Sequence, residues 1–386
     1  MQTLKNFNCK LPTYTIVWNE TSNPSQFFVE YKDDAAGMTQ WSSDWDEIFG
    51  YSAVLLDASG NEIEEVKQSS PWILDMSSFT NALTWTANNV MIKFPRRWIK
   101  MSKSWTQVTL SITLDPNKDW YQYYAFTKWT TAKDNLYLWA YKGSFSNDNS
   151  SVSSSFSSST TKLKSRATGV RTANFSPATS QTRANFRASA SNNWAWYSLI
   201  TIYPRWYINC LMMMKYGNPY SQSIIWAWYT KSSNTQSIEP WTTNSQTSAT
   251  YWTSDDTKQI KMFGLEDRWW NVTEFLDGCW FDASKNLTVD KTNSVFQDSD
   301  YATNLWVAQS GYLAWIDGSN DGMFRNISTS WWSWTAYYTD YSYSYVSVVL
   351  FAGGNWNAGA DAGAFYVAST YASAASANNG GRLMFL

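Results

Sequence analysis

The chain has 386 residues, of which 44% are hydrophobic, and a formal net charge of −2. This length allows two or three domains with a sizeable core, and the near-neutral charge gives no electrostatic reason to bind nucleic acid or an anionic membrane. The chain has no histidine, which excludes the usual general base, the Ser-His-Asp and Cys-His nucleophile systems and histidine-containing metal sites. Carboxylate or lysine chemistry stays open, but we expect a binding protein without cofactor or metal.

No run of eighteen apolar residues occurs, and the N-terminal MQTLKNFNCKLP has no apolar core. We therefore expect neither a transmembrane helix nor a Sec signal, and a protein that is intracellular, exported by another route or carried on a particle. The three cysteines, Cys9, Cys210 and Cys279, are far apart and lack metal-site spacing. We interpret them as buried or incidental thiols.

The first 85 residues predict a small β-rich module with little helix, suited to attachment or assembly. Its strands are expected within 11–33 (TYTIVW and FFVEYK) and 51–66 (SAVLLDASGNEIEEV, with a turn at SGN). A second domain is expected over 86–386, and β-branched and aromatic residues predict its first sheet. The strands of that sheet are expected at 88–94, 107–113, 121–126 and 135–141.

Residues 144–165 are rich in serine and predict a surface loop inside this second domain. Two helices should follow. The first is expected over 181–191, after Ser/Thr capping candidates, and the second begins near Pro204 and ends at Gly217. The methionine-rich spacing of the second helix indicates core packing rather than a cofactor site.

The last 36 residues, 351–386, place glycines and large apolar residues among small polar ones. We expect positive φ or close backbone approach at these glycines, namely Gly353, Gly354, Gly359, Gly363, Gly380 and Gly381. Apolar anchors are expected at Trp356, Phe365, Leu383 and Phe385. A glycine-rich hairpin that completes a core accounts for this pattern equally well.

The tail pattern GGxWxxGxxAGxFY followed by GxRL resembles the closing segment of C-type-lectin-fold proteins, as found in variable proteins of diversity-generating retroelements and in phage receptor-binding tips. Formylglycine-generating enzymes share this fold. KMFGLEDRWWNVTEFLDG at 261–278 resembles the central stretch of the family. FPRRWIKMSKS, LYLWAYKGS, TRANFRASASNNWAWYS and NPYSQSIIWAWYT resemble blocks of phage adhesins in the same order. The resemblance covers 88–386 and leaves out the first 85 residues.

The resemblance implies an α+β chain: a C-type lectin fold with two helices, antiparallel sheets and long loops, preceded by the β-rich module. It also implies a rigid scaffold that carries a variable region at about 330–386. The scaffold positions would be Gly353, Gly354, Trp356, Gly359, Gly363, Phe365, Gly381 and Arg382. The variable, ligand-binding positions would be Tyr337, Tyr338, Asp340, Tyr341, Tyr343, Asn355, Asn357, Asp361 and Tyr371.

The tyrosines of 330–351 have two interpretations. Tyr341, Tyr343 and Tyr345 alternate with serine, as on one face of an amphipathic strand. They would equally suit a recognition loop, because tyrosine gives large contact area at low entropic cost.

The carboxylates Glu266, Asp267, Glu274 and Asp277 could do acid–base work or bind calcium, but their spacing is not that of a calcium loop. The resemblance implies that they brace the fold through buried hydrogen bonds. The formylglycine-generating enzymes need a late pair of cysteines, and this chain has none after Cys279. We therefore expect no enzymatic activity.

Tryptophan occurs 26 times and glycine only 17 times. Ten tryptophans stand where turn chemistry or the family pattern favours glycine: Trp98, Trp105, Trp120, Trp129, Trp139, Trp194, Trp196, Trp226, Trp228 and Trp270. Glycine at all ten would bring its share to about 7%, the ordinary value. We hypothesise that the source reads UGA as glycine; the alternative is a tryptophan-rich carbohydrate-binding surface. Six others are expected to be genuine: Trp18, Trp41, Trp45, Trp72, Trp269 and Trp356.

These features together predict a protein that binds a protein or carbohydrate ligand on another cell or particle, without nucleic acid and without membrane insertion. It would stand on a phage tail tip, where a homotrimer would fit, or on a bacterial surface. The alternatives are a structural tail or surface protein without diversification and, less favoured, a formylglycine-generating type of enzyme.

Overall fold

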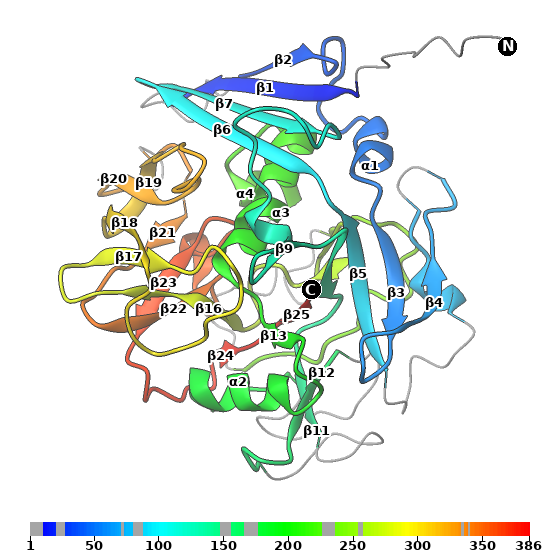
Figure 1. The fold of residues 1–386 in the computed structure, drawn as a ribbon, viewed down its shortest axis with the longest axis vertical. Coiled ribbons are helices and arrows are strands. Elements are labelled where there is room, and N and C mark those ends of the chain that lie inside the picture. The colour runs from blue at the N-terminus through cyan, green and yellow to red at the C-terminus, as the bar shows by residue number, and fades with distance from the viewer. Residues whose placement is uncertain are drawn as a thin grey trace, which may run out of the picture.

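A computed structural model gives the fold as a mixed α+β arrangement made mostly of sheet (Figure 1). It describes residues 11–20, 28–70, 73–79, 88–146, 156–165, 177–225, 236–253, 258–332, 336–338 and 340–386. Within these ranges the chain forms three larger sheets around one central helix and its packed neighbours. The described helices include none that is both long and apolar enough to cross a membrane.

The two predicted helices are confirmed, and their ends follow the capping residues. In α2 (Arg183–Ser191) the Thr182 side chain accepts a hydrogen bond from the Asn185 N–H at 3.2 Å. α3 (Ile202–Tyr216) ends at Gly217, whose φ of 54° lets its N–H reach the Met213 carbonyl. Two short helices, α1 (Asp44–Phe49) and α4 (Ser221–Ile225), were not predicted.

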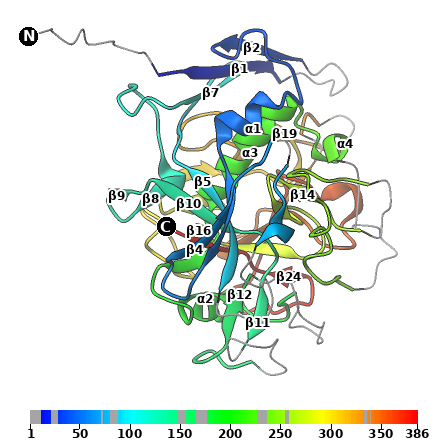
Figure 2. The same ribbon diagram turned by 90° about the vertical axis from the view of Figure 1, so that its right-hand side faces the viewer.

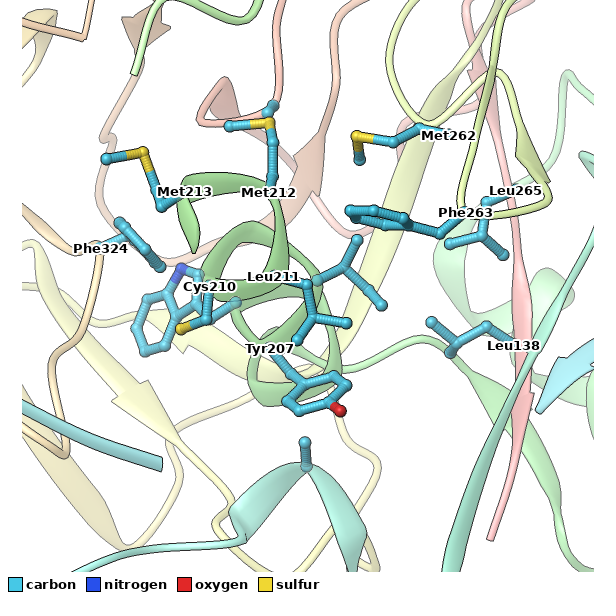
Figure 3. Packing of buried hydrophobic residues seen from close by; sticks show 14 of the residues in the cluster. Leu138, Tyr207, Cys210, Leu211, Met212, Met213, Met262, Phe263, Leu265 and Phe324 are labelled. Carbon is cyan, nitrogen blue, oxygen red and sulfur yellow. The ribbon is translucent and has the colours of Figure 1, made fainter. Parts of the chain in front are cut away.

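Helix α3 is the centre of the core, and every one of its residues is buried. Figure 3 shows Leu211, Met212 and Met213 with Met262, Phe263 and Phe324 around them. The polar side chains of α3, Arg205, Asn209 and Lys215, are buried as well and form hydrogen bonds within the protein. The methionine-rich stretch is therefore core packing, as predicted.

A four-stranded sheet lies at one end of the molecule, with the order β2-β1-β7-β6 (Figure 1). Figure 2 shows α1 and α3 side by side beneath it. The prediction missed β6, which forms a hairpin with β7. The strands are β1 (Thr13–Asn19), β2 (Val29–Asp33), β6 (Trp98–Ser104) and β7 (Gln107–Thr113).

A six-stranded sheet follows, with the order β13-β25-β10-β5-β3-β4. The C-terminal β25 lies between β13 and β10, so the last residues complete the sheet. The expected strand at 121–126 is wrong, because Tyr124–Phe126 forms a 3-10 helix. The strands are β3 (Ser52–Leu56), β4 (Glu62–Val66), β5 (Asn89–Pro95), β10 (Asn135–Trp139), β13 (Tyr197–Leu199) and β25 (Leu383–Phe385).

Strands from both sides of residue 85 share these two sheets. β1 pairs with β7 from Thr13↔Thr113 to Asn19↔Gln107. β3 pairs with β5 from Ser52↔Lys93 to Leu56↔Asn89. The β-rich character expected of residues 1–85 is present, but the strands described in this part of the chain all belong to sheets that they share with later residues.

The third sheet has nine strands and curls into a half-barrel, with the order β18-β17-β16-β22-β23-β21-β19-β20 and β24 beside β16. It contains β16, which begins in the later part of the 261–278 block, and the tail strands β22, β23 and β24. The strands are β16 (Thr273–Phe281), β17 (Asn286–Val289), β18 (Thr303–Val307), β19 (Gly311–Ile316), β20 (Asn326–Ser330), β21 (Tyr341–Ser342), β22 (Val348–Ala352), β23 (Val367–Thr370) and β24 (Asn379–Gly380).

Three two-stranded ribbons complete the described strands. The serine-rich segment is not all loop, because its ends pair from Ser144↔Lys164 to Ser146↔Lys162, while 147–155 lies outside the described residues. The ribbons are β8 (Thr127–Lys128) with β9 (Thr131–Ala132), β11 (Ser144–Ser146) with β12 (Lys162–Lys164), and β14 (Lys261–Met262) with β15 (Leu265–Glu266).

The tryptophans predicted to stand at glycine-like positions divide into two groups. Trp105, Trp120, Trp129 and Trp270 have positive φ, between 53° and 68°. Trp98, Trp139, Trp194 and Trp196 do not have positive φ. Trp139 is also fully buried at the end of β10, so the glycine interpretation fails at Trp139. Trp226 and Trp228 lie outside the described residues.

Trp41 was expected to be a genuine tryptophan at a position that does not suit glycine. Its φ of 63° shows that this expectation was wrong. Trp18, Trp45, Trp269 and Trp356 are buried without positive φ. Trp72 lies outside the described residues. Trp241 and Trp306 also have positive φ and were not predicted.

A buried ion pair joins α1 to α3. Lys215 Nζ lies 2.6 and 2.7 Å from the two carboxylate oxygens of Asp46, which also accepts the Tyr51 hydroxyl at 2.7 Å. Both charged side chains are fully buried. Lys215→Met should lower the free energy of unfolding by about 3–5 kcal/mol, because it leaves a buried carboxylate without its cation. Chemical denaturation measures this change.

The double variant Asp46→Leu/Lys215→Met is the control for this pair. It should be more stable than Lys215→Met alone, because it removes both charges together. A double variant less stable than either single variant would contradict the account.

Candidate functional site

The charged centre of the molecule is Glu274, which lies in β16 and within the block 261–278. Its carboxylate accepts from Arg382 Nε at 2.6 Å, Lys142 Nζ at 2.9 Å and Arg205 Nη1 at 2.9 Å. Arg268 Nη1 lies 3.4 Å away. All five side chains are buried. We call this set, Glu274 with Lys142, Arg205, Arg268 and Arg382, the Glu274 cluster.

The Glu274 cluster ties together segments that are distant in sequence. Lys142 follows β10, Arg205 lies in α3 and Arg382 precedes the terminal β25. Although burial favours a neutral carboxyl, the positive charges of Arg382, Lys142 and Arg205 lower the pKa of Glu274 to about 2. Glu274 is therefore ionised at neutral pH, as the geometry requires.

The remaining carboxylates of the block are also buried and hydrogen-bonded. Glu266 accepts from the Thr243 N–H at 3.0 Å and the Thr243 hydroxyl at 2.7 Å. Asp267 accepts from Asn271 Nδ2 at 2.9 Å, and Asp277 accepts from Arg187 at 2.7 and 2.9 Å. The bracing role that the resemblance implies for these residues is confirmed. Among the described residues, no three His, Cys, Asp or Glu side chains are grouped to hold a metal ion.

The predicted scaffold residues of the tail have the geometry expected of them. Gly353, Gly354 and Gly359 have φ values of 93°, 76° and 56°. At Gly363 a Cβ atom would stand 2.1 Å from Asp340 Oδ1, and at Gly381 it would stand 3.0 Å from the Phe186 ring. Trp356 and Phe365 are buried, and Arg382 belongs to the Glu274 cluster. These positions accordingly admit little but the glycine, the apolar anchor or the arginine present.

Three residues predicted for the variable face are buried instead: Tyr337, Tyr338 and Asp340. The Tyr338 hydroxyl donates to Glu20 at 2.8 Å, so the N-terminal strand covers it. Asp340 accepts from the Phe365 N–H at 2.8 Å, and burial raises its pKa well above the usual value. This part of the prediction is wrong, because these side chains join the tail to the core.

The tyrosines that follow Asp340 are more accessible to solvent. In 340–345 the buried Asp340, Ser342 and Ser344 alternate with the more accessible tyrosines. Tyr341 and Tyr343 pack with ring centroids 4.2 Å apart, and Tyr341 meets Tyr312 edge-on at 4.9 Å. We call Tyr312, Tyr341, Tyr343 and Asp361 the tyrosine cluster.

Asp361 is joined to this cluster by a hydrogen bond from the Tyr312 hydroxyl at 2.7 Å. Partial burial and the Asp361 carboxylate raise the pKa of Tyr312. Tyr312 therefore stays a protonated donor at neutral pH. The arrangement presents aromatic faces, phenol groups and one carboxylate, which suits recognition by contact and hydrogen bonding.

The last three predicted residues lie apart from the rings of the cluster. Asn355 and Asn357 lie on the loop that leads to Asp361, and Asn355 Oδ1 accepts from the Asn357 N–H at 3.0 Å. Tyr371 is exposed and directly follows β23, which joins the Tyr343 backbone through Val367 and Ser369. The structure thus brings Tyr341, Tyr343 and Asp361 together, while the Tyr371 ring has no aromatic contact with them among the described residues.

Tyr312 is the cluster member that the sequence analysis missed. It lies in β19, outside the expected variable region, and reaches the cluster because β19 pairs with β21 at Tyr312↔Tyr341. The alternation of GYLAWI could have indicated an outward tyrosine, but not its neighbours.

The two described cysteines, Cys210 and Cys279, are free and fully buried, as predicted for incidental thiols. Burial raises the pKa of Cys279 to about 12. Cys9 lies outside the described residues. A surface hollow of about 610 Å³ beside α1 is lined by Asp46, Tyr51, Glu65 and Lys67, among others, and by no member of the tyrosine cluster.

Comparison of the chain with protein-family models and with curated proteins finds no match.

Glu274→Gln should lower the free energy of unfolding by about 3–5 kcal/mol, because four buried cations lose their one shared carboxylate. The folded-state pKa of about 2 lies below the usual value of 4.5. The contribution is therefore present above about pH 4.5 and is lost as the pH falls towards 2. Denaturation curves between pH 2 and 7 measure both effects, and the variant should lack this part of the acid dependence.

Glu30→Gln is the matched control, since its ion pair with Lys32 is roughly half exposed. This variant should change the free energy of unfolding by less than about 0.5 kcal/mol. Equal losses for the two variants would contradict the importance given to the Glu274 cluster.

Proposed function

We propose that this chain is a receptor-binding or adhesin protein that displays a diversified, tyrosine-rich C-terminal surface on a rigid scaffold of the C-type lectin kind. The single observation that carries the proposal is the alternation in 340–345, where buried and outward side chains take turns within one short segment. Outward residues can be exchanged there without altering the core contacts of their neighbours.

The surroundings of that segment support the proposal. The Phe365 N–H on Asp340 and the close approach of Gly363 fix the backbone beneath the tyrosines. The Glu274 cluster holds the end of the tail through Arg382. A preorganised surface loses little conformational entropy when it binds a partner.

The partner would be a protein or carbohydrate on another cell or particle. It would be bound by surface complementarity, without a catalysed reaction. A phage tail tip, with the chain as a homotrimer, or a bacterial surface would present the cluster outward. The second candidate is a structural tail or surface protein of the same fold that is not diversified.

The DNA around the gene separates these two functions. Diversification by a retroelement requires a neighbouring reverse transcriptase and a template repeat of the 3′ end, with substitutions at adenines. We expect the variable codons to include those of Tyr341, Tyr343, Asn357 and Asp361, and to leave out Tyr338 and Asp340. A 3′ end without a template repeat would support the structural protein, and a template repeat that varies the buried positions would contradict the tyrosine cluster as the variable face.

Tyr341→Ala/Tyr343→Ala should lower binding to a host cell or glycan panel at least tenfold, because it removes two packed aromatic contacts. Its melting temperature should stay within about 2 °C of the parent, since both side chains lie on the outward face. Cell adsorption and glycan-array binding measure the first effect, and thermal unfolding measures the second.

Tyr371→Ala is the control, because this exposed tyrosine has no ring contact with the tyrosine cluster among the described residues. It should bind like the parent. If the double variant binds as well as the parent to every surface that the parent recognises, the tyrosine cluster is not the binding face.

A further inference from the structure

Tryptophan is concentrated at backbone positions that suit glycine. Five of the 26 tryptophans lie outside the described residues, and seven of the other 21 have φ between 53° and 75°. Only a few per cent of non-glycine residues have positive φ, and for a bulky side chain it is a genuine outlier. The seven are Trp41, Trp105, Trp120, Trp129, Trp241, Trp270 and Trp306. We infer that the natural protein carries glycine at these seven positions, encoded by UGA codons that its source reads as glycine.

Two of the seven occupy the same position in two separate hairpins. Trp105 and Thr106 form the two-residue loop between Ser104 and Gln107, and Trp129 and Thr130 form the loop between Lys128 and Thr131. In each loop the first residue alone has positive φ, 57° and 53°. That combination defines a type II′ turn, in which the first central residue is normally glycine.

Two more positions have turn or bulge geometry that also requires glycine. Trp41 is the third residue of the turn 39–42, closed by the Ser42 N–H on the Thr39 carbonyl, and positive φ there defines a type II turn. Trp306 lies where β18 has one residue more than β17, with a φ of 69°. A bulge with its first residue in the left-handed region is ordinarily built on glycine.

Three of the seven indoles are largely exposed and contribute little to the fold, whereas Trp270 lies in the core and Trp41 and Trp241 pack against it. Trp105, Trp120 and Trp306 are 91%, 81% and 72% exposed. Trp270 is buried, yet its Nε1–H has no hydrogen-bond partner among the described residues. A carbohydrate-binding surface would explain exposed indoles, but not the left-handed backbone that they share with a buried one.

The remaining tryptophans supply an internal comparison. Trp18, Trp45 and Trp206 are buried in the core and have no positive φ. These indoles fill space that glycine would leave empty, so UGG codons are expected there. UGA and UGG differ only in the third base, so a translation that assigns UGA to tryptophan makes the two groups indistinguishable in the protein sequence.

Sequencing the gene and measuring peptide masses of the protein from its natural source test the inference directly. We expect UGA at all seven positions with peptide masses for glycine, and UGG at Trp18, Trp45 and Trp206 with masses for tryptophan. UGG codons at the seven positions, or tryptophan masses there, would overturn the inference.

Stability measurements on the recombinant chain give an independent test. Trp105→Gly and Trp129→Gly should each raise the melting temperature by about 1–3 °C, because the strained turn is relieved. Trp45→Gly, the control in the core, should lower it by 5 °C or more, roughly what a large core deletion produces. A lower melting temperature for both hairpin variants would contradict glycine at these positions.

Discussion

The fold depends on one buried carboxylate shared by four cations. Glu274 is enclosed with Lys142, Arg205, Arg268 and Arg382, where an unpaired charge would cost several kcal/mol. Each cation arrives on a different segment, so the cluster forms only when the sheets, α3 and the tail have come together. Arg382 also donates to the carbonyls of Trp139 and Glu266, which places the last residues of the chain inside the molecule. Such a centre specifies one arrangement of distant segments.

A tail held in this way can support exchangeable side chains. Asp340 and Gly363 fix the backbone from beneath, and Tyr341 and Tyr343 project from it without core contacts of that kind. The division is residue by residue within the short segment 340–345, whose buried and more accessible side chains alternate as in an extended chain. This separation of stability from surface chemistry is what the proposed binding function requires.

The sequence predicted those features that depend on neighbouring residues, namely helix ends and glycine positions. The expected helix over 181–191 begins two residues late, after the cap Thr182, and Gly217 ends the second helix as expected. The tail glycines stand where positive φ or close approach needs them. Contacts over long sequence distances could not be predicted. Tyr338 appeared to be a surface residue because its partner, Glu20, lies 318 residues away.

Other predictions failed because the local sequence misled them. The aromatic run at 121–126 has β propensity, but Tyr124–Phe126 packs as a 3-10 helix against α3. Trp139 was assigned to a position that favours glycine, and is instead buried core at the end of β10. Tyr312 joined the candidate site only through strand pairing with β21, which periodicity alone does not reveal.

We propose that the buried residues of the tail stabilise the fold and that its outward residues can be exchanged without loss of stability. Saturation mutagenesis of 337–371, with protease resistance of the folded chain as the readout, tests it most directly. We expect Tyr341, Tyr343, Asn357 and Asp361 to accept most substitutions, and Tyr338, Asp340 and Gly363 to accept almost none. Equal intolerance at the two groups would contradict the account, because the tyrosines would then be part of the scaffold.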